Sequence, residues 1–255
     1  MVFDLGAGLA GRGVMVTGAG GGIGREVARA FAAAGARVLA VDLRADAVEA
    51  VVAELEGDGH AGAAVDLSDI STHAGLVSRA RDELGGLYVL AHLAAVLRRR
   101  DSIDDVSEED WDVQLDVNLK AAFFLCREVG MALQAAGRGG RIVAFSSQGW
   151  WTGGFGGSVV YCAAKGGVVS FTRGLARTFG PANITVNCVA PGAVETPMLL
   201  GGLTDDDVRN MEAATPLRRL GQPHELAGPV VFLLSQHASF VSGATLNVSG
   251  AWLMY

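Results

Sequence analysis

The sequence predicts an α/β fold in which a doubly wound parallel sheet carries helices on both faces. Three observations lead to this expectation. Short β-branched runs alternate with longer helical patterns along the whole chain, the runs are apolar throughout, and several glycines lie at strand-to-helix turns. A strand without a polar face must be buried on both sides, so helices have to cover both faces of the sheet, with right-handed crossovers.

Seven segments have the length and composition of buried strands. They are residues 13–17, 37–41, 61–65, 87–91, 141–145, 184–189 and 245–248. Helical patterns fall between them: the first covers residues 22–34 and ends at Gly35, and the second continues to Leu55. The longest helical patterns cover residues 108–134 and 160–179.

Length and composition favour one domain over residues 1–255. Half of the residues (50%) are apolar and only 18% are charged, which allows a large core and is unlike a disordered chain. No repeat, low-complexity segment or Pro/Gly/Ser linker divides the sequence. A single layered unit is therefore expected.

The charge argues against nucleic acid as a partner. The formal net charge is −7, so a phosphate backbone would be repelled. The basic run at residues 98–100 is short, and a solvated loop explains it better than a nucleic-acid patch.

Cysteines, histidines and the first residues indicate a cytoplasmic protein without a metal site. Cys126, Cys162 and Cys188 are an odd number without paired spacing, and the five histidines are scattered. Reduced thiols favour an intracellular compartment. The first residues lack the features of a signal peptide, and no apolar stretch is long enough to span a bilayer, so no membrane partner is expected.

A glycine-rich turn at residues 17–24 joins the first strand to the first helix. Glycines allow positive φ and close approach of the backbone to a pyrophosphate, while the helix N-terminus supplies free N–H groups. A glycine turn can be purely structural, but this position is what a dinucleotide site requires. The expected cofactor contacts in the turn are Gly18, Gly22, Ile23 and Gly24.

Acidic residues after the next two strands favour NAD as the cofactor. Asp42 closes the second strand, where a carboxylate accepts hydrogen bonds from the adenosine ribose hydroxyls and repels a 2′-phosphate. The glycine turn offers such a phosphate no basic residue, although Arg44 is close in sequence. Asp66 and Leu67, after the third strand, are expected beside the adenine.

Tyr161 and Lys165 lie one helical turn apart at the start of a predicted helix and therefore share a face. Lowering a tyrosine pKa from about 10 to about 7 needs roughly 4 kcal/mol. An ammonium about 4 Å away, at an effective dielectric near 20, offers an interaction of about that size. With the positive charge of a nicotinamide, one lysine could be enough. The same spacing is common by chance, so the pair gains its meaning from its companions.

Three further segments accompany this pair. Ser146 and Ser147 follow the fifth strand, Asn118 lies in the long helix before it, and residues 187–197 (NCVAPGAVETP) follow the sixth strand. Together with the glycine turn, and in this order, these motifs resemble the short-chain dehydrogenase/reductase family of the compact single-domain type, from about residue 9 onward. The resemblance implies a Rossmann-like domain with a cofactor half at about 9–150 and a catalytic and substrate half at about 140–255.

The resemblance also implies roles for single residues. Tyr161 would protonate a carbonyl oxygen, or accept an alcohol proton, while hydride passes to or from the nicotinamide of NAD. Lys165 would lower the tyrosine pKa and bind the nicotinamide ribose, Ser147 would hydrogen-bond the substrate oxygen, and Asn118 would hold a water linked to Lys165. The further cofactor contacts that it implies are Ala94, Pro191, Gly192, Val194 and Thr196.

Two segments depart from the family pattern. Residues 92–95 are His-Leu-Ala-Ala where the family commonly has Asn-Asn-Ala-Gly, and His92 is expected to supply structural hydrogen bonds. The segment between Ser147 and Tyr161 is about one residue longer than usual and rich in aromatics. If it lines the pocket, the substrate is bulky and apolar, cyclic or aromatic; packing in the core or at a subunit contact is the equal alternative. The candidate substrate contacts are Gln148, Trp150, Trp151 and Phe155.

Several alternatives stay open from the sequence. The apolar tail at residues 246–255 implies a homotetramer by resemblance, although it could pack on its own subunit. Residues 197–217 are expected to form a lid over the substrate. Residues 218–225 resemble 3-oxoacyl thioester reductases, which usually favour NADP, whereas Asp42 opposes NADP. A protein that senses NAD without catalysis is the alternative of another class.

Overall fold

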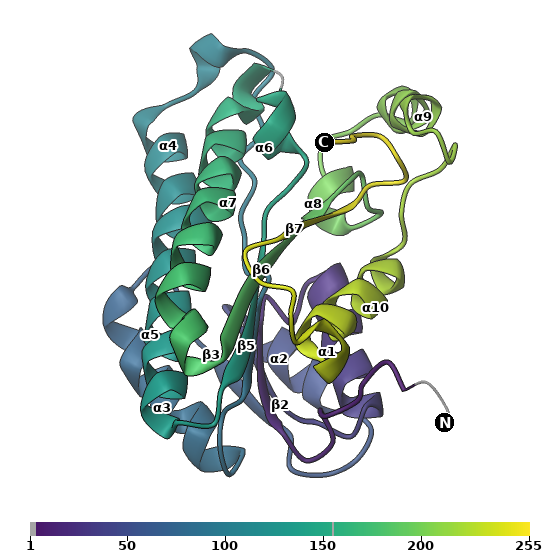
Figure 1. Ribbon diagram of the computed structural model, residues 1–255. Coiled ribbons are helices and arrows are strands. Elements are labelled where there is room, and N and C mark those ends of the chain that lie inside the picture. Colours follow the sequence, from purple (N-terminus) through teal and green to yellow (C-terminus); the bar gives the residue numbers. More distant parts are fainter. Residues whose placement is uncertain (1–3, 155) are drawn as a thin grey trace.

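A parallel sheet forms the centre of the molecule. The computed structural model describes residues 4–154 and 156–255. Within them seven strands follow the order β3-β2-β1-β4-β5-β6-β7, and all neighbours pair in parallel (Figure 1). The strands are β1 (Gly13–Thr17), β2 (Arg37–Asp42), β3 (Ala61–Ala64), β4 (Val89–His92), β5 (Gly140–Phe145), β6 (Ile184–Pro191) and β7 (Thr245–Val248). The predicted fold class is confirmed; β4 begins two residues later than expected and β6 ends two residues later.

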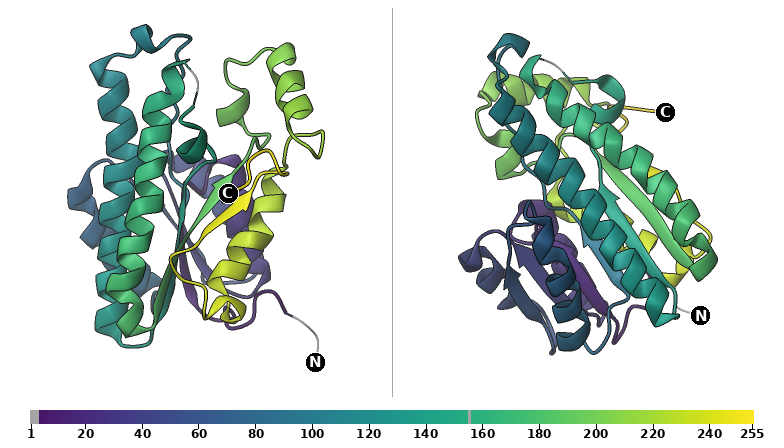
Figure 2. Two further views of the ribbon diagram at one scale, coloured as in Figure 1. Left: turned by 45° about the horizontal axis from the view of Figure 1, so that its top comes forward. Right: turned by 90° about the vertical axis from the view of Figure 1, so that its left-hand side faces the viewer.

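Helices cover both faces of this sheet (Figures 1 and 2). On one face α1 (Gly22–Ala33) packs beside α10 (Pro223–Leu234), and on the other α5 (Ala122–Ala136) packs beside α7 (Val159–Phe179). The shorter or more peripheral helices are α2 (Ala45–Val52), α3 (His73–Glu83), α4 (Glu108–Leu115), α6 (Gly149–Thr152), α8 (Pro197–Leu200) and α9 (Asp205–Ala214). Among the helices described, none has the length and apolar character needed to cross a membrane.

The sheet separates two apolar cores, because successive side chains of a strand point to opposite faces. In β1, Val14 and Val16 belong to the core on the side of α1 and α10, where Phe31 is fully buried. Met15, between them, belongs to the core on the side of α5 and α7, together with Leu125. Both faces of the strand are buried, which is why the strand sequences are apolar throughout.

The chain changes direction across the sheet between β3 and β4. Because β1 lies between β2 and β4, strands β2 and β3 extend from it to one edge of the sheet, and strands β4 to β7 extend to the other. In such sheets the loops at the carboxyl ends diverge at this point and leave a crevice for ligands. Thr17 and His92, the last paired residues of β1 and β4, mark this crevice.

The helix predicted over residues 108–134 is present but interrupted. α4 ends at Leu115, a π-helical turn covers Asp116–Ala121, and α5 follows directly. A π-helical turn holds one residue more than an α-helical turn and is frequent at functional sites. Here it carries Asn118, which is only 1% exposed. The apolar spacing of the sequence does not distinguish this turn from a continuous α-helix.

The segment after β6 stands away from the sheet (Figure 1). It holds α8 and α9, and α9 begins with a capping box between Thr204 and Asp207. α9 buries none of its residues. Its local hydrogen bonds rather than a core hold it, which is typical of segments that open and close, and residues 197–217 are called the lid segment below.

Candidate active site

The glycine turn packs directly on the segment after β4. Gly18 has a φ of 66°, and a Cβ on it would lie 2.7 Å from the Ala94 nitrogen. A Cβ on Gly24 would lie 2.0 Å from the Gly18 carbonyl oxygen. Glycine alone fits at both positions. α1 begins without a side-chain cap, so its first N–H groups are available to a ligand.

Asp42 lies against the glycine turn, as the sequence predicts for a ribose-binding carboxylate. Its Oδ2 accepts a hydrogen bond from the Gly20 N–H at 2.9 Å, and a Cβ on Gly20 would meet the same oxygen at 3.0 Å. The guanidinium of Arg44 is exposed and pairs with Asp46. The positive charge of Arg44 is therefore directed toward Asp46 on α2.

The next candidates lie one strand further out. Asp42 and Ala64 are in register between β2 and β3, so Asp66 and Leu67 follow at the same edge of the sheet. The exposed carboxylate of Asp66 accepts hydrogen bonds from the Ser68 N–H and hydroxyl at 2.9 Å and 2.7 Å. Leu67 is buried in the core on the side of α5 and α7.

The end of β6 forms the other wall of the crevice. A Cβ on Gly22 would lie 3.1 Å from the Thr196 Cγ2, so the first turn of α1 nearly touches this wall. Pro191 accepts a hydrogen bond from the Gln148 N–H, and the Gly192 N–H donates to Val248 at 2.9 Å. The candidates in this wall are Pro191, Gly192, Val194 and Thr196, of which Pro191 and Val194 are buried. Ile23, on the opposite wall, packs against the core of α1 and α10.

His92 ties β4 to β1, which is the structural role expected for it. Its Nδ1 lies 2.8 Å from the Thr17 hydroxyl, and that hydroxyl also accepts the Leu93 and Ala94 N–H groups at 3.2 Å and 3.3 Å. Burial lowers the pKa of His92 to about 3, and the positive charge of Lys165 adds to the effect. The ring is therefore neutral at physiological pH.

Asn118 holds the loop after β4. Its Oδ1 accepts the Val96 N–H at 2.9 Å, and its Nδ2 donates to the Val96 carbonyl at 2.8 Å. The side-chain amide is thus engaged on both of its polar atoms. A water linked to Lys165, as the family resemblance implies, would have to bind the backbone of the π-helical turn instead.

Ser147, Tyr161 and Lys165 come together between the end of β5 and α7. The Ser147 hydroxyl lies close enough to the Tyr161 phenol to oppose the rise in its pKa, and the Lys165 Nζ lies 5.5 Å from the centre of the Tyr161 ring. Lys165 is buried, and its ammonium donates to the Phe145 carbonyl at 2.8 Å. The hydroxyl of Ser146 points elsewhere and donates to the Lys165 carbonyl.

The charges of this group differ from the sequence expectation. Burial raises the pKa of the Tyr161 phenol, and the hydrogen bond with Ser147 only partly opposes this. Burial lowers the pKa of Lys165 to about 8. The ammonium lies beside the tyrosine ring and donates one of its three N–H groups to the Phe145 carbonyl. Spacing along a helix places two residues on one face but does not aim the lysine at the phenolic oxygen.

The candidate substrate contacts lie on α6, directly after Ser147. Gln148 is buried, Trp150 is half-buried against the core, and Trp151 is exposed. Phe155 lies outside the described residues. The two indole rings also meet Tyr255, with 5.0 Å between the ring centres of Trp150 and Tyr255. The sequence reasoning did not name Tyr255 as a site residue; the apolar composition of the tail was the one signal available.

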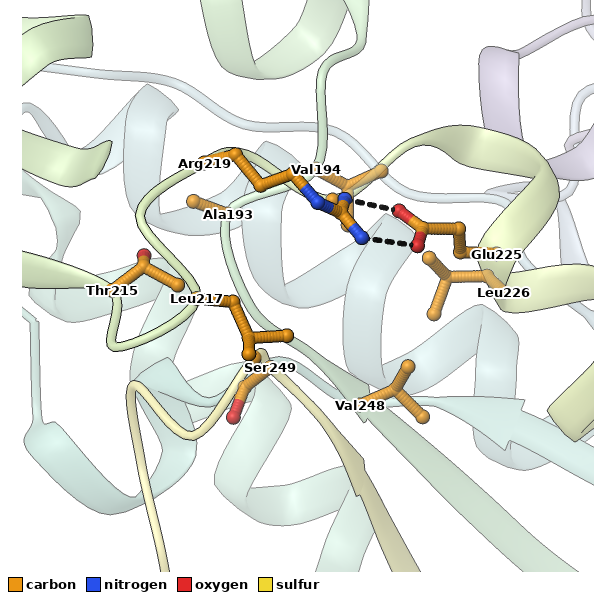
Figure 3. Close-up of a pocket in the computed structure, with 11 residues that line it drawn as sticks. Ala193, Val194, Thr215, Leu217, Arg219, Glu225, Leu226, Val248 and Ser249 are labelled. Carbon is orange, nitrogen blue, oxygen red and sulfur yellow. Dashed lines mark hydrogen bonds and ion pairs between the residues drawn. The ribbon is translucent and has the colours of Figure 1, made fainter.

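A separate cavity of about 210 Å³ lies behind Val194 (Figure 3). It is bounded by the end of the lid segment, the residues after β7 and the start of α10. Figure 3 shows Arg219 reaching Glu225, with two hydrogen bonds of 2.6 Å that hold the pKa of Glu225 at about 2. The described residues lining it include neither Ser147 nor Tyr161.

Comparisons with known proteins agree with this arrangement. A family model described as enoyl-(acyl carrier protein) reductase matches residues 18–251. The chain belongs to the short-chain dehydrogenase/reductase family. Members of this family are oxidoreductases that use nicotinamide cofactors, so this chain is an oxidoreductase.

Two relatives and one solved structure show how far the family likeness extends. The chain is 37% identical over 245 residues to the (2S)-[(R)-hydroxy(phenyl)methyl]succinyl-CoA dehydrogenase subunit of Thauera aromatica, covering 95% of this chain and 97% of that protein. It is 37% identical over 248 residues to the D-threitol dehydrogenase of Mycolicibacterium smegmatis, covering 96% and 94%. A crystal structure from Sinorhizobium meliloti, described as that of a "putative short-chain alcohol dehydrogenase", superimposes with a TM-score of 0.91 at 34% identity, covering 98% of both chains.

Proposed function

We propose that the protein transfers a hydride between NAD(H) and a secondary alcohol or ketone, with Tyr161 as its acid/base. One observation carries the proposal. The Ser147 hydroxyl lies beside the Tyr161 phenol at the end of β5, with the buried ammonium of Lys165 beside the tyrosine ring. A polar group of this kind, next to a glycine turn that leaves helix N–H groups free, suits proton transfer coupled to a bound dinucleotide.

The residues along the crevice fit such a cofactor. The glycine turn would hold the pyrophosphate at the start of α1, and Asp42 would accept the adenosine ribose hydroxyls. A Cβ on Gly20 would contact Asp42, and a Cβ on Gly22 would contact Thr196. The absence of both Cβ atoms supports the proposal that a ligand runs between these two walls. When bound, the nicotinamide accepts the hydride from the alcohol carbon or supplies it to the ketone carbon. The remaining proposed contacts are Gly18, Ile23, Gly24, Asp66, Leu67, Ala94, Tyr161, Lys165, Pro191, Gly192 and Val194.

The chain's own residues would move the proton. In reduction the Tyr161 hydroxyl donates its proton to the carbonyl oxygen, and in oxidation the phenolate oxygen takes it from the alcohol. Ser147 donates a hydrogen bond to the same substrate oxygen. Lys165 would lower the tyrosine pKa through its positive charge, and it can keep its bond to the Phe145 carbonyl because the ammonium carries two further N–H groups. Asn118 would hold the water through its backbone, since its side chain is bound to Val96.

Activity is tested by following reduced nicotinamide absorbance with NAD and a broad panel of secondary alcohols. Oxidation of at least one class of alcohol is the expected result. The alternative of another class, an NAD-sensing protein, predicts that calorimetry detects NAD binding while no alcohol or ketone is turned over. That result would remove the proposed reaction.

NAD rather than NADP is the proposed cofactor. Asp42 keeps its carboxylate on the glycine turn, and Arg44 pairs with Asp46 instead of facing the ribose site. A 2′-phosphate would therefore meet a negative charge without a compensating guanidinium. Catalytic efficiency is expected to be higher with NAD, and Asp42→Ala should narrow the difference. A higher efficiency with NADP in the unaltered protein would overturn this preference.

The proposed substrate is bulky and apolar, because Trp150 and Trp151 stand directly after Ser147. A 3-oxoacyl thioester reductase is the second candidate, supported by the acyl-carrier description of the matching family model. Assays with a 3-oxoacyl thioester and with ring-bearing ketones separate the two. Activity restricted to small polyols would contradict both.

We also propose a homotetramer, a single domain and a cytoplasmic location. Trp111 and Met131 on the outer side of α4 and α5 are exposed, and Phe240 is fully exposed, which supports a subunit contact. The three cysteines are buried free thiols, which suits a reducing compartment. Light scattering that reports a monomer would exclude the tetramer, and separate unfolding transitions would exclude a single domain.

A further inference from the structure

Three aromatic rings meet beside Ser147, and one of them comes from a distant part of the sequence. The ring centres of Trp150 and Trp151 are 5.2 Å apart, and those of Trp150 and Tyr255 are 5.0 Å apart, both edge-to-face. Trp151 and Tyr255 complete the triangle at 6.0 Å. Aromatic rings attract one another at these distances. The three rings are called the aromatic cluster below.

The aromatic cluster adjoins the groups proposed to react. The Trp150 N–H donates to the Ser147 carbonyl at 3.0 Å, so α6 starts in the turn that presents the Ser147 hydroxyl. A Cβ on Gly149 would lie 2.5 Å from the sulfur of Cys162, the residue after Tyr161. α6 is thereby held against the first turn of α7. The cluster thus packs on the helical turn that carries Tyr161.

A defined turn, rather than a loose segment, sets the position of Tyr255. After β7 the chain reverses through Gly250 and Ala251, which have φ angles of 62° and 65°. The Leu253 carbonyl accepts hydrogen bonds from the Asn247 side-chain amide and from the Ser249 hydroxyl. A left-handed Ala persists only where its surroundings hold it. Figure 1 shows the tail leaving β7, passing below α9 and ending between α6 and α9.

Two of the three rings remain open to solvent. Trp151 is 58% exposed and Tyr255 is 48% exposed, whereas Trp150 packs against the core on the side of α5 and α7. Trp150 therefore anchors the cluster, and the other two rings offer π faces to a ligand. Open aromatic surface beside convergent polar groups is typical of a substrate pocket.

We propose that Tyr255 is a specificity-determining residue, which with Trp150 and Trp151 holds an aromatic ring of the substrate next to the carbon that exchanges hydride. This inference rests on the proposed function, because it takes Tyr161 as the reacting group. A planar ring meets the cluster edge-to-face, and a saturated ring of similar size lacks that electrostatic match. The substrate class is aryl-bearing secondary alcohols and their ketones.

Calorimetry on the full chain saturated with NAD tests the inference without turnover, because a ketone and the oxidised cofactor cannot react. The probes are acetophenone and cyclohexyl methyl ketone, which differ in the aromaticity of the ring. Tyr255→Ala is expected to weaken acetophenone binding about fivefold, the loss of roughly one aromatic pair, and to leave cyclohexyl methyl ketone unchanged. Tyr255→Phe keeps the ring and should bind both probes as the unaltered protein does. Met254→Ala, at an exposed neighbour, is the matched control and should change neither.

Each other outcome overturns the inference. An equal loss for both ketones means a general apolar cover, a gain for both means that Tyr255 blocks the site, and no change means that it only fastens the tail. Acetophenone that fails to bind the unaltered protein at millimolar concentration has the same meaning. If the aryl preference appears but no alcohol is oxidised, the proposed function fails and the cluster stands; if alcohols are oxidised without aryl preference, the inference fails alone.

Discussion

The parts of the crevice where we propose that the cofactor and the substrate bind, called the cofactor wall and the substrate wall below, are built in different ways. On the cofactor wall, Gly18 and Gly24 bring backbone against backbone with no room for a Cβ. On the substrate wall, Trp151 and Tyr255 are half exposed and α9 buries nothing. Rigid backbone contacts suit a ligand shared by a whole family, while open rings and a weakly packed helix suit a ligand that differs between members.

The largest effect is expected at Tyr161, where the two walls meet. Tyr161→Phe removes the proton donor but keeps the ring, so turnover should fall by about 10²–10⁴-fold while NAD binding stays unchanged. Steady-state kinetics and calorimetry with NAD measure the two quantities. Tyr88→Phe, just before β4 at the opposite end of the sheet, serves as the control and should keep full activity. Near-normal turnover of Tyr161→Phe would rule out Tyr161 as the acid/base.

On the cofactor wall, Gly18→Ala and Gly137→Ala form a matched pair. Both glycines have a φ of 66°, but a Cβ on Gly137 meets nothing within 4 Å, whereas one on Gly18 presses on Ala94. Both variants bear the left-handed strain, and only Gly18→Ala adds a clash of about 1–3 kcal/mol at the crevice. The NAD dissociation constant should rise at least about tenfold in Gly18→Ala alone. Equal NAD affinity in both variants would contradict the rigid cofactor wall.

His92, also on the cofactor wall, is expected to make stability depend on pH. Its pKa is lowered from 6.5 to about 3, so the unfolded chain binds a proton below pH 6.5 that the folded chain refuses, and stability falls as the pH falls. Between pH 6.5 and pH 5 this loss is about 2 kcal/mol. His92→Asn cannot take up the proton. Urea unfolding at pH 7 and pH 5 should show a loss about 2 kcal/mol smaller in the variant; an identical loss would mean that His92 is accessible to protons.

The smallest effect is expected on the substrate wall, at Arg99. Its guanidinium donates to the Leu199 and Gly201 carbonyls at 3.2 Å and 2.7 Å and thus ties the loop after β4 to the end of α8. Loss of this partly exposed tie in Arg99→Ala should raise the KM for the alcohol about fivefold, with NAD affinity unchanged. Arg98→Ala, at the exposed neighbouring residue, is the control. A fall in NAD affinity instead would mean that the loop belongs to the cofactor wall.

Prediction from the sequence succeeded where the local environment of the backbone restricts which residue types can occupy a position. The seven strands followed from apolar runs, because both faces of each central strand are buried. Asp42 on the glycine turn followed from its place at the end of a strand. The π-helical turn around Asn118 did not, since a single added residue leaves the apolar spacing almost unchanged.

Contacts between distant segments were beyond the sequence for a different reason. The aromatic cluster joins Trp150 to Tyr255, and the tie of Arg99 joins the loop after β4 to the lid segment. Such contacts depend on how two chain segments pack against each other in space, and a short stretch of sequence does not predict that packing.

The layered fold, the family and the residue types of the proposed reaction centre could be inferred from the sequence alone, because periodicity, glycine turns and a tyrosine–lysine spacing are local properties of the chain. The packed molecule was needed to show where the Lys165 ammonium points, what His92 binds and which aromatic rings gather beside Ser147. These depend on burial and on partners supplied by other strands and helices, and burial is a property of the packed molecule.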